Sequence, residues 1–243
     1  LSHNVSRLEK DPEKILRGLE IVMDLVNASH GIIAIKDIHK DAILSVKKVL
    51  RNERFSIFPL ENIYPMGEER ALIRETLGVL LEPDQLPSAA SAIVINAETL
   101  FRIYEAVDLC KPLIDKDMTV AGKLKENASV HIFTDIPIGM KVKDVLAKAG
   151  GPGPHYGELI MGGPFTGKRT SLESPVVKTT GGIIAAEEFL PAPDKIGLLV
   201  CACGADAERL KQQAASMGAE VVGIEYCKQA RPVKNSRKCE NPG

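Results

Sequence analysis

The sequence predicts an α/β protein in which a parallel-sheet domain precedes a small β-rich α+β module and a short βαβ unit. Three observations predict this class. Helical and strand patterns alternate over residues 1–111, short strands and dense turns replace them from Pro112, and a strand-helix-strand pattern closes the chain. These changes of pattern divide the chain into residues 1–111, 112–190 and 191–243.

The composition is that of an ordinary globular protein, since 44% of the 243 residues are hydrophobic and 26% are charged. The net charge of −1 lacks the cationic excess on which binding to a phosphate backbone relies. No apolar run approaches the roughly 20 residues of a membrane span, and the first residues have no apolar signal core. We therefore expect a cytoplasmic protein that neither binds nucleic acid nor spans a membrane.

The first domain begins with a helix. Asp11 and Pro12 supply an N-cap and a first helical residue, and apolar residues on one face extend the helix over 12–27. The apolar runs 31–35 and 55–60 flank an amphipathic segment, which is the pattern of a βαβ unit.

The alternation continues with a helix over 68–77 that ends at Gly78, a strand over 92–95 and a helix around 100–107. A parallel sheet normally opens with a strand, whereas this chain opens with a helix. We therefore expect a further strand upstream of residue 1.

The module from Pro112 carries short strand patterns over 118–122, 129–134 and 158–162, with one small helix around 142–146. Its Gly162–Lys168 segment has the spacing of a phosphate-binding loop. Arg169 stands where that loop needs a hydroxyl for Mg²⁺, so the sequence excludes a nucleoside triphosphatase.

The terminal unit concentrates cysteines. Cys201 and Cys203 follow the first strand, over 196–200, and Cys227 follows the second, over 220–224. Since a βαβ crossover makes the two strands parallel, these thiols converge at one carboxyl edge.

Cys239 follows on a basic tail, which we expect to be a solvated segment, with docking of an acidic carrier protein as the alternative. The four thiols can hold an iron–sulfur cluster or zinc, or act as a dithiol relay. Buried cysteines that only cap a strand are the structural alternative.

An acidic turn joins the second strand to the helix that follows it. Gly67, Glu68 and Glu69 lie at this strand-to-helix turn, the place where parallel sheets bind ligands. Strand ends after Leu60 and Ile95 would bring this turn and Asn96 to one edge of the sheet. Acidic residues in a first helical turn are also favoured by the helix dipole alone.

These segments together resemble a known family. They are Gly67-Glu68-Glu69-x-Ala71-Leu72-Ile73, Asn96-x-Glu98-Thr99-Leu100 and Gly162-Gly163-Pro164-x-Thr166-Gly167. Over about residues 1–190 the chain resembles the flavin-carrying NADH-dehydrogenase subunit of complex I and the C subunit of the Rnf electron-transport complex. Its cysteine-containing end, through Cys239-Glu240-Asn241-Pro242-Gly243, is similar to the Rnf-C-like electron-transfer proteins associated with proline reductase in anaerobes.

The resemblance implies a Rossmann-like domain of the complex I flavoprotein type, then an SLBB-like β-grasp module at about 113–172. By position, Glu68 and Glu69, which follow Gly67, match the acidic pair that lies beside the flavin and the nicotinamide in this family. Asn96 and Thr99 match the segment that contacts the flavin. The glycine-rich flavin loop of the family would lie upstream of residue 1.

The implied function is NADH-dependent electron transfer through FMN and a thiol or iron–sulfur centre. The implied partners are other electron-transfer subunits and a reductase, either proline reductase or a related enzyme. Association with a membrane would then be through a complex.

Two other functions remain open. One is a non-catalytic adaptor whose β-grasp module binds a ligand or partner and whose cysteines hold structural zinc. The other is a flavin-free thiol–disulfide carrier in which Cys201 and Cys203 form the reversible pair. Iron with sulfide would indicate electron transfer, and zinc would indicate the adaptor.

Overall fold

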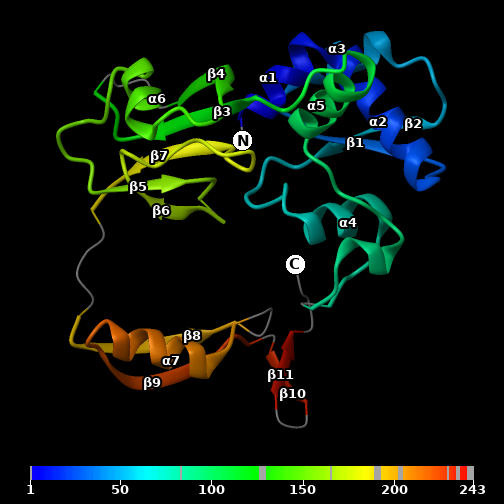
Figure 1. Ribbon diagram of the computed structural model, residues 1–243. Helices are drawn as coiled ribbons and strands as arrows, with labels where there is room; N and C mark the ends of the chain where they lie inside the picture. Colours follow the sequence, from blue (N-terminus) through cyan, green and yellow to red (C-terminus); the bar gives the residue numbers. More distant parts are fainter. Residues whose placement is uncertain are drawn as a thin grey trace. The chain divides into compact units, whose positions relative to one another are not determined.

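The computed structural model describes residues 2–82, 84–125, 130–164, 166–188, 193–201, 205–228, 230–233 and 236–239, with the backbone alone for residues 230, 233 and 236–239 (Figure 1). The chain separates into two compact units. Unit 1 consists of residues 1–62 and 95–189, and unit 2 consists of residues 63–94 and 190–243.

Unit 1 begins with an α/β part. Its elements are α1 (Ser2–Lys10), α2 (Pro12–Val26), β1 (Gly31–Lys36), α3 (Lys40–Val49), β2 (Phe55–Leu60) and α5 (Ala97–Asp108). β1 and β2 pair in parallel, from Gly31 opposite Phe55 to Lys36 opposite Leu60. Alternate residues of β1 are buried, and the buried ones join an apolar core shared with the helices.

A glycine allows two of these helices to cross closely. A Cβ atom on Gly18 of α2 would stand 2.0 Å from the carbonyl oxygen of Leu100 in α5. Side chains of both helices, among them Ile15 and Phe101, belong to the same buried cluster. The α2–α5 contact therefore depends on the absence of a side chain at one position.

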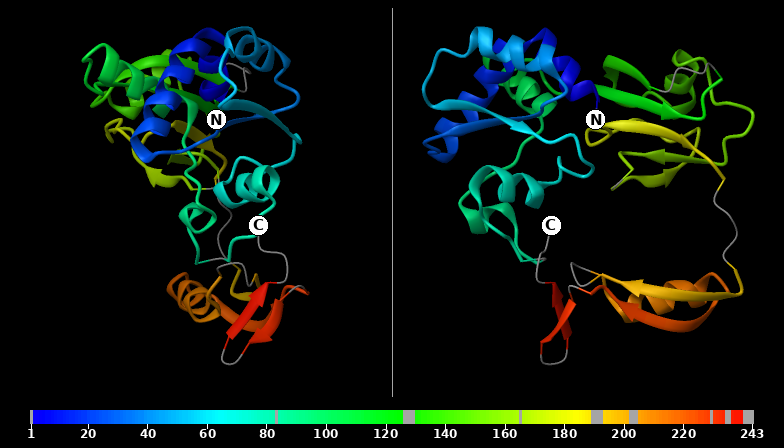
Figure 2. Two further views of the ribbon diagram at one scale, coloured as in Figure 1. Left: turned by 90° about the vertical axis from the view of Figure 1, so that its right-hand side faces the viewer. Right: turned by 180° about the vertical axis from the view of Figure 1, so that it is seen from behind.

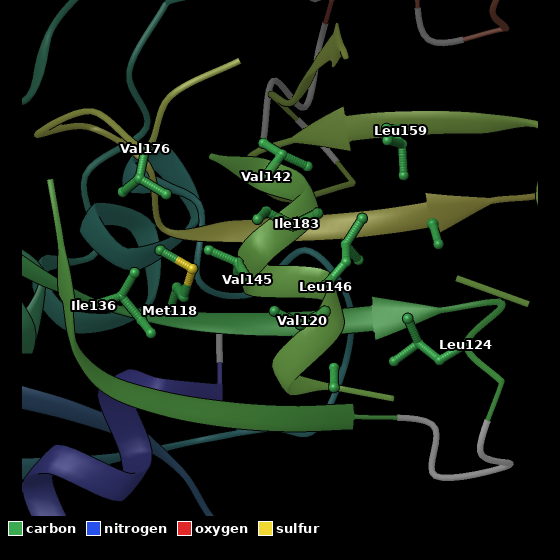
Figure 3. Close-up of a cluster of buried hydrophobic side chains, with 12 residues drawn as sticks. Met118, Val120, Leu124, Ile136, Val142, Val145, Leu146, Leu159, Val176 and Ile183 are labelled. Atoms are coloured by element: carbon green, nitrogen blue, oxygen red, sulfur yellow. The ribbon is translucent and has the colours of Figure 1, made fainter. Parts of the chain in front are cut away.

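The second part of unit 1 is a mixed five-stranded sheet. Its elements are β3 (Asp115–Gly122), β4 (Val130–Pro137), α6 (Val142–Lys148), β5 (Glu158–Met161), β6 (Lys168–Thr170) and β7 (Gly182–Ala186). The strand order is β4-β3-β7-β5-β6, with β3 and β7 parallel and the other neighbours antiparallel. Helix α6 lies on one face of this sheet. Its fully buried Val145 and Leu146 face Val120 and Ile183 of the strands (Figure 3).

Unit 2 holds the remaining elements. They are α4 (Glu69–Leu77), the 3₁₀ helix η1 (Pro87–Ala90), β8 (Lys195–Val200), α7 (Ala207–Ser216), β9 (Glu220–Tyr226), β10 (Ala230–Val233) and β11 (Ser236–Cys239). β8 and β9 are parallel, and α7 covers one face of this pair in the front and rear views (Figures 1 and 2). β10 and β11 form an antiparallel hairpin.

The predicted α/β class is confirmed, as are the parallel strands of the first domain and the terminal βαβ unit. The strand predicted over 92–95 is wrong. These residues are a connection outside any described strand, and Ile93 is 60% exposed. A short apolar run does not distinguish a strand from an extended lead into a helix, because pairing with a neighbour decides between them.

The sequence pattern does not indicate α1, β7 or the tail hairpin. β7 lies in the middle of the five-stranded sheet, although only five residues form it. The basic tail, expected to be solvated, forms β10 and β11 over its described residues, and Arg231 and Pro232 are exposed there. Among the described residues, no helix combines the length and apolar character needed to cross a bilayer.

Candidate functional site

The acidic turn before α4 uses one of its two glutamates to cap the helix. Glu68 has an extended backbone at the N-cap, and its Oε2 accepts hydrogen bonds from the N–H groups of Arg70 (3.0 Å) and Ala71 (3.2 Å). Glu69, the first helical residue, is exposed. The two predicted acidic residues therefore differ, since Glu68 is engaged with the backbone and Glu69 extends to the surface.

Two other features of this turn suit a ligand. Gly67 is exposed, and a Cβ atom added there would meet nothing within 4 Å, so the fold itself does not require glycine. Arg70 lies 3.5 Å from Glu68 through its Nε atom, while its Nη1 atom is buried with no hydrogen-bond partner in the described part of the chain. A buried donor of this kind suits an anionic group.

Asn96 and Thr99 lie in the first turn of α5. Asn96 is the N-cap residue, yet its side chain makes no capping hydrogen bond, and both side chains are exposed. The Oδ1 atom of Asn4, in α1, instead accepts the N–H of Glu98 at 3.0 Å. The polar groups of Asn96 and Thr99 are thus not used to build the helix end.

The two predicted sets of site residues belong to different units. Gly67, Glu68 and Glu69 belong to unit 2, and Asn96 and Thr99 to unit 1. We expected the ends of two strands to hold these residues at one sheet edge. This expectation is wrong for the second strand, because residues 92–95 do not form a strand. Their convergence on one ligand stays a prediction.

A buried ionic network includes Glu98, which lies between Asn96 and Thr99 in the first turn of α5. Asp117 of β3 is fully buried and accepts hydrogen bonds from Nε and Nη2 of Arg7, both at 2.6 Å. It also accepts one from Nη2 of Arg102 at 2.9 Å. Glu98, itself buried, binds Nε of Arg102 at 3.2 Å and Nζ of Lys116. The network ties α1 and α5 to β3 and so fixes the turn that carries Asn96 and Thr99.

The network changes the acidity of its members. Burial raises the pKa of Asp117, but hydrogen bonds and charge from Arg7, together with the charge of Arg102, outweigh it and lower the pKa below its ordinary value. Nearby, burial lowers the pKa of His3 to about 4, and its Nδ1 lies 3.0 Å from the hydroxyl of Thr119.

Sequence reasoning missed the ionic network. Glu98, Arg102 and Glu105 are spaced so that they share one face of α5, and this spacing was the available signal. It does not reveal that Arg7 and Asp117, 110 residues apart, meet there.

The cysteine cluster is partly described. Cys201 directly follows β8 and is exposed, and Cys227 directly follows β9 and is half-buried. The N–H of Cys227 donates to the carbonyl of Val200 at 3.0 Å, which closes the last pair of the β8–β9 ladder. The predicted convergence of these two at the carboxyl edge is therefore confirmed for the backbone.

The other two cysteines are described less fully. Cys203 lies outside the described residues, and of Cys239 only the backbone is described, as the last residue of β11 opposite Ala230. Within the described part of the chain, no three His, Cys, Asp or Glu side chains are grouped as metal ligands would be.

The first part of the chain is similar to a known domain. Residues 1–105 match the Nuo51 FMN-binding domain. This stretch contains every residue predicted for the flavin and nicotinamide site, from Gly67 to Thr99.

Three relatives share more of the chain. It is 33% identical over 180 residues to cobalamin reductase PduS of Salmonella typhimurium, a match covering 73% of the chain and 39% of that protein. It is 31% identical to the C subunit of the Na(+)-translocating ferredoxin:NAD(+) oxidoreductase complex of Acetobacterium woodii, over 71% of the chain and 39% of the relative. It is 30% identical to the C subunit of the ion-translocating oxidoreductase complex of Pseudomonas aeruginosa, over 74% of the chain and 23% of the relative. The chain thus spans well under half the length of these relatives.

Proposed function

We propose that this chain is part of an electron-transfer protein in which NADH reduces FMN and the electrons pass to a reductase. The observation that carries the proposal is the match of residues 1–105 to an FMN-binding domain, because it spans both candidate ligand-binding turns. The relatives support it, since one is named as a reductase and two as subunits of redox complexes.

The residues present fit FMN. Asn96 and Thr99 offer exposed polar groups at the first turn of α5, which can form hydrogen bonds with FMN. When bound, FMN would supply hydride and electron chemistry that these side chains lack. The ionic network around Asp117 would hold the α5 turn in place against the ligand.

For NADH, the structure favours different roles for the two glutamates. Glu69 is exposed, so its carboxylate can accept hydrogen bonds from hydroxyl or amide groups of a nucleotide. Glu68 already accepts two backbone N–H groups and would position Gly67 and Glu69 by fixing where α4 begins.

The remaining parts of the proposal rest on the resemblance. Residues 1–111 would be the flavin domain, 112–190 an SLBB-like module, and 191–243 the unit that passes electrons on through thiols or an iron–sulfur cluster. The acceptor would be proline reductase or a related reductase. The chain would work in the cytoplasm with other electron-transfer subunits, reaching a membrane only through their complex.

The test is an anaerobic titration with FMN and NADH, followed by absorbance. It uses this chain and, where the gene encodes residues upstream of Leu1, the extended chain. We expect bound FMN that NADH bleaches. Glu69→Gln should raise the Kd for NADH about 10-fold, the effect of losing a hydrogen bond to a charged group. Glu75→Gln, a second glutamate of α4, is the matched control and should leave the Kd unchanged.

Substitutions of Glu68 separate capping from ligand contact. Glu68→Ser retains a capping oxygen and should keep NADH affinity, whereas Glu68→Ala should destabilise the helix by about 1 kcal/mol. The proposal fails if neither chain binds FMN. Zinc alone in the purified protein would favour the adaptor function instead.

A further inference from the structure

The ends of β8 and β9 place two cysteines side by side. The strands pair in parallel up to Val200 opposite Tyr226, and the hydrogen bond from the N–H of Cys227 to the carbonyl of Val200 closes this last pair. Cys201 and Cys227 directly follow the pair, so their backbones lie at neighbouring strand ends although 26 positions separate them in sequence.

Neighbouring strands are about 4.8 Å apart. A disulfide needs Cα atoms about 4.4–6.8 Å apart. The spacing of the two strand ends is therefore compatible with a bond between these two cysteines.

The pair is also accessible. Cys201 is exposed and Cys227 is half-buried. Both lie at the carboxyl edge of a parallel sheet, the edge at which such sheets bind their ligands. Buried structural thiols lack this access, whereas reactive thiols require it.

We infer that Cys201 and Cys227 form a reversible dithiol–disulfide pair. This assignment deepens the proposed function, because the pair would be the group that passes electrons on. It differs from the Cys201–Cys203 pairing expected from their closeness in sequence.

The chemistry is thiol–disulfide exchange with a disulfide-containing partner. Cys201, the more exposed thiol, loses its proton and attacks one sulfur of the partner disulfide, forming a mixed disulfide and releasing one partner thiolate. Cys227 then loses its proton and attacks the sulfur of Cys201. The Cys201–Cys227 bond forms, the mixed disulfide breaks, and the second partner thiolate leaves. Two electrons pass from the pair to the partner, and the two protons end on the partner thiols.

The experiment is peptide mapping of the whole chain after equilibration in redox buffers of oxidised and reduced dithiothreitol. Remaining thiols are alkylated before digestion with trypsin. Trypsin places Cys201 and Cys203 on residues 196–209, Cys227 on residues 212–228 and Cys239 on residues 239–243. We expect a linked peptide of 196–209 with 212–228 in oxidising buffer, lost on reduction as a single two-electron transition.

Variants decide which cysteine of residues 196–209 is joined. Cys203→Ser and Cys239→Ser should keep the linked peptide and its midpoint, and Cys201→Ser and Cys227→Ser should abolish it. Cys110→Ser, in unit 1, is the matched control and should change nothing. Cys201→Ala and circular dichroism of each variant separate loss of the bond from loss of the fold.

Three results would overturn the assignment. They are a link that survives Cys201→Ser but not Cys203→Ser, a link from residues 239–243, and no disulfide at any potential. None of these measurements needs FMN or NADH. The thiol pair can therefore fail while the flavin activity stands, and the reverse also holds.

Discussion

At the scale of single residues, the most consequential side chain is Asp117. It is fully buried and pairs with two guanidinium groups, those of Arg7 in α1 and Arg102 in α5. The two helices are far apart in the sequence. A buried charge is costly unless it is paired, so every member of the network depends on the others. The N–H of Asp117 also donates to Oε1 of Glu98 at 3.3 Å, which holds Glu98, two residues after Asn96, against β3.

Asp117→Asn should therefore destabilise the protein by about 3 kcal/mol at pH 7, since it removes the fully buried anion that Arg7 and Arg102 share and leaves them the half-exposed Asp135. The folded-state pKa of Asp117 is lowered. Its contribution is thus fully present above the ordinary carboxyl pKa and is lost as the pH falls through the lower folded-state value. Urea unfolding of both proteins should show a constant gap from pH 8 to about 5 that narrows below about pH 4.

Glu173→Gln is the matched control for this prediction. Glu173 also accepts hydrogen bonds from two cations, Lys141 and Lys143, which lower its pKa to about 2, but it lies on the surface. Solvent screens such pairs, so its loss should change the unfolding free energy far less. An equal loss of unfolding free energy in the two variants would show that burial does not set the contribution of Asp117 to stability.

At the scale of elements, the crossing of α2 and α5 determines where the second candidate turn lies. The backbones meet at Gly18 and Leu100, one residue beyond Thr99. Because the contact is made by backbone atoms, neither helix can adjust by changing a rotamer.

Gly18→Ala should therefore destabilise the protein by about 1–3 kcal/mol, although alanine favours an isolated helix by about 1 kcal/mol. Thermal unfolding followed by circular dichroism measures the change. Gly197→Ala in β8 is the control, because a Cβ atom there meets nothing within 4 Å. A stabilised Gly18→Ala variant would contradict the close crossing.

At the scale of the whole molecule, each of the two apolar cores is built from its own part of the sequence. One core uses residues between Leu8 and Phe101, and the other uses residues between Met118 and Ala185. Among the described residues, none of the terminal βαβ unit or the hairpin belongs to either cluster.

A chain of residues 1–188 keeps both clusters and should therefore retain the unfolding transition of unit 1, with a Tm within about 3 °C of that transition in the full chain in calorimetry. A chain of residues 1–160 loses β6 and β7 and should not fold cooperatively, because β7 joins β3 to β5 in the middle of the sheet. A broad transition for residues 1–188 would show that the terminal unit is needed for folding.

The sequence by itself determined the α/β class, most helices and strands, and the order of the motifs around Glu68, Asn96 and the cysteines. These features depend on neighbours within a few positions, through periodicity, caps and turn residues. It did not determine that β7 would join two strands of the sheet or that Arg7 would meet Asp117. Such contacts join residues far apart in the chain, so only the packed tertiary structure decided them.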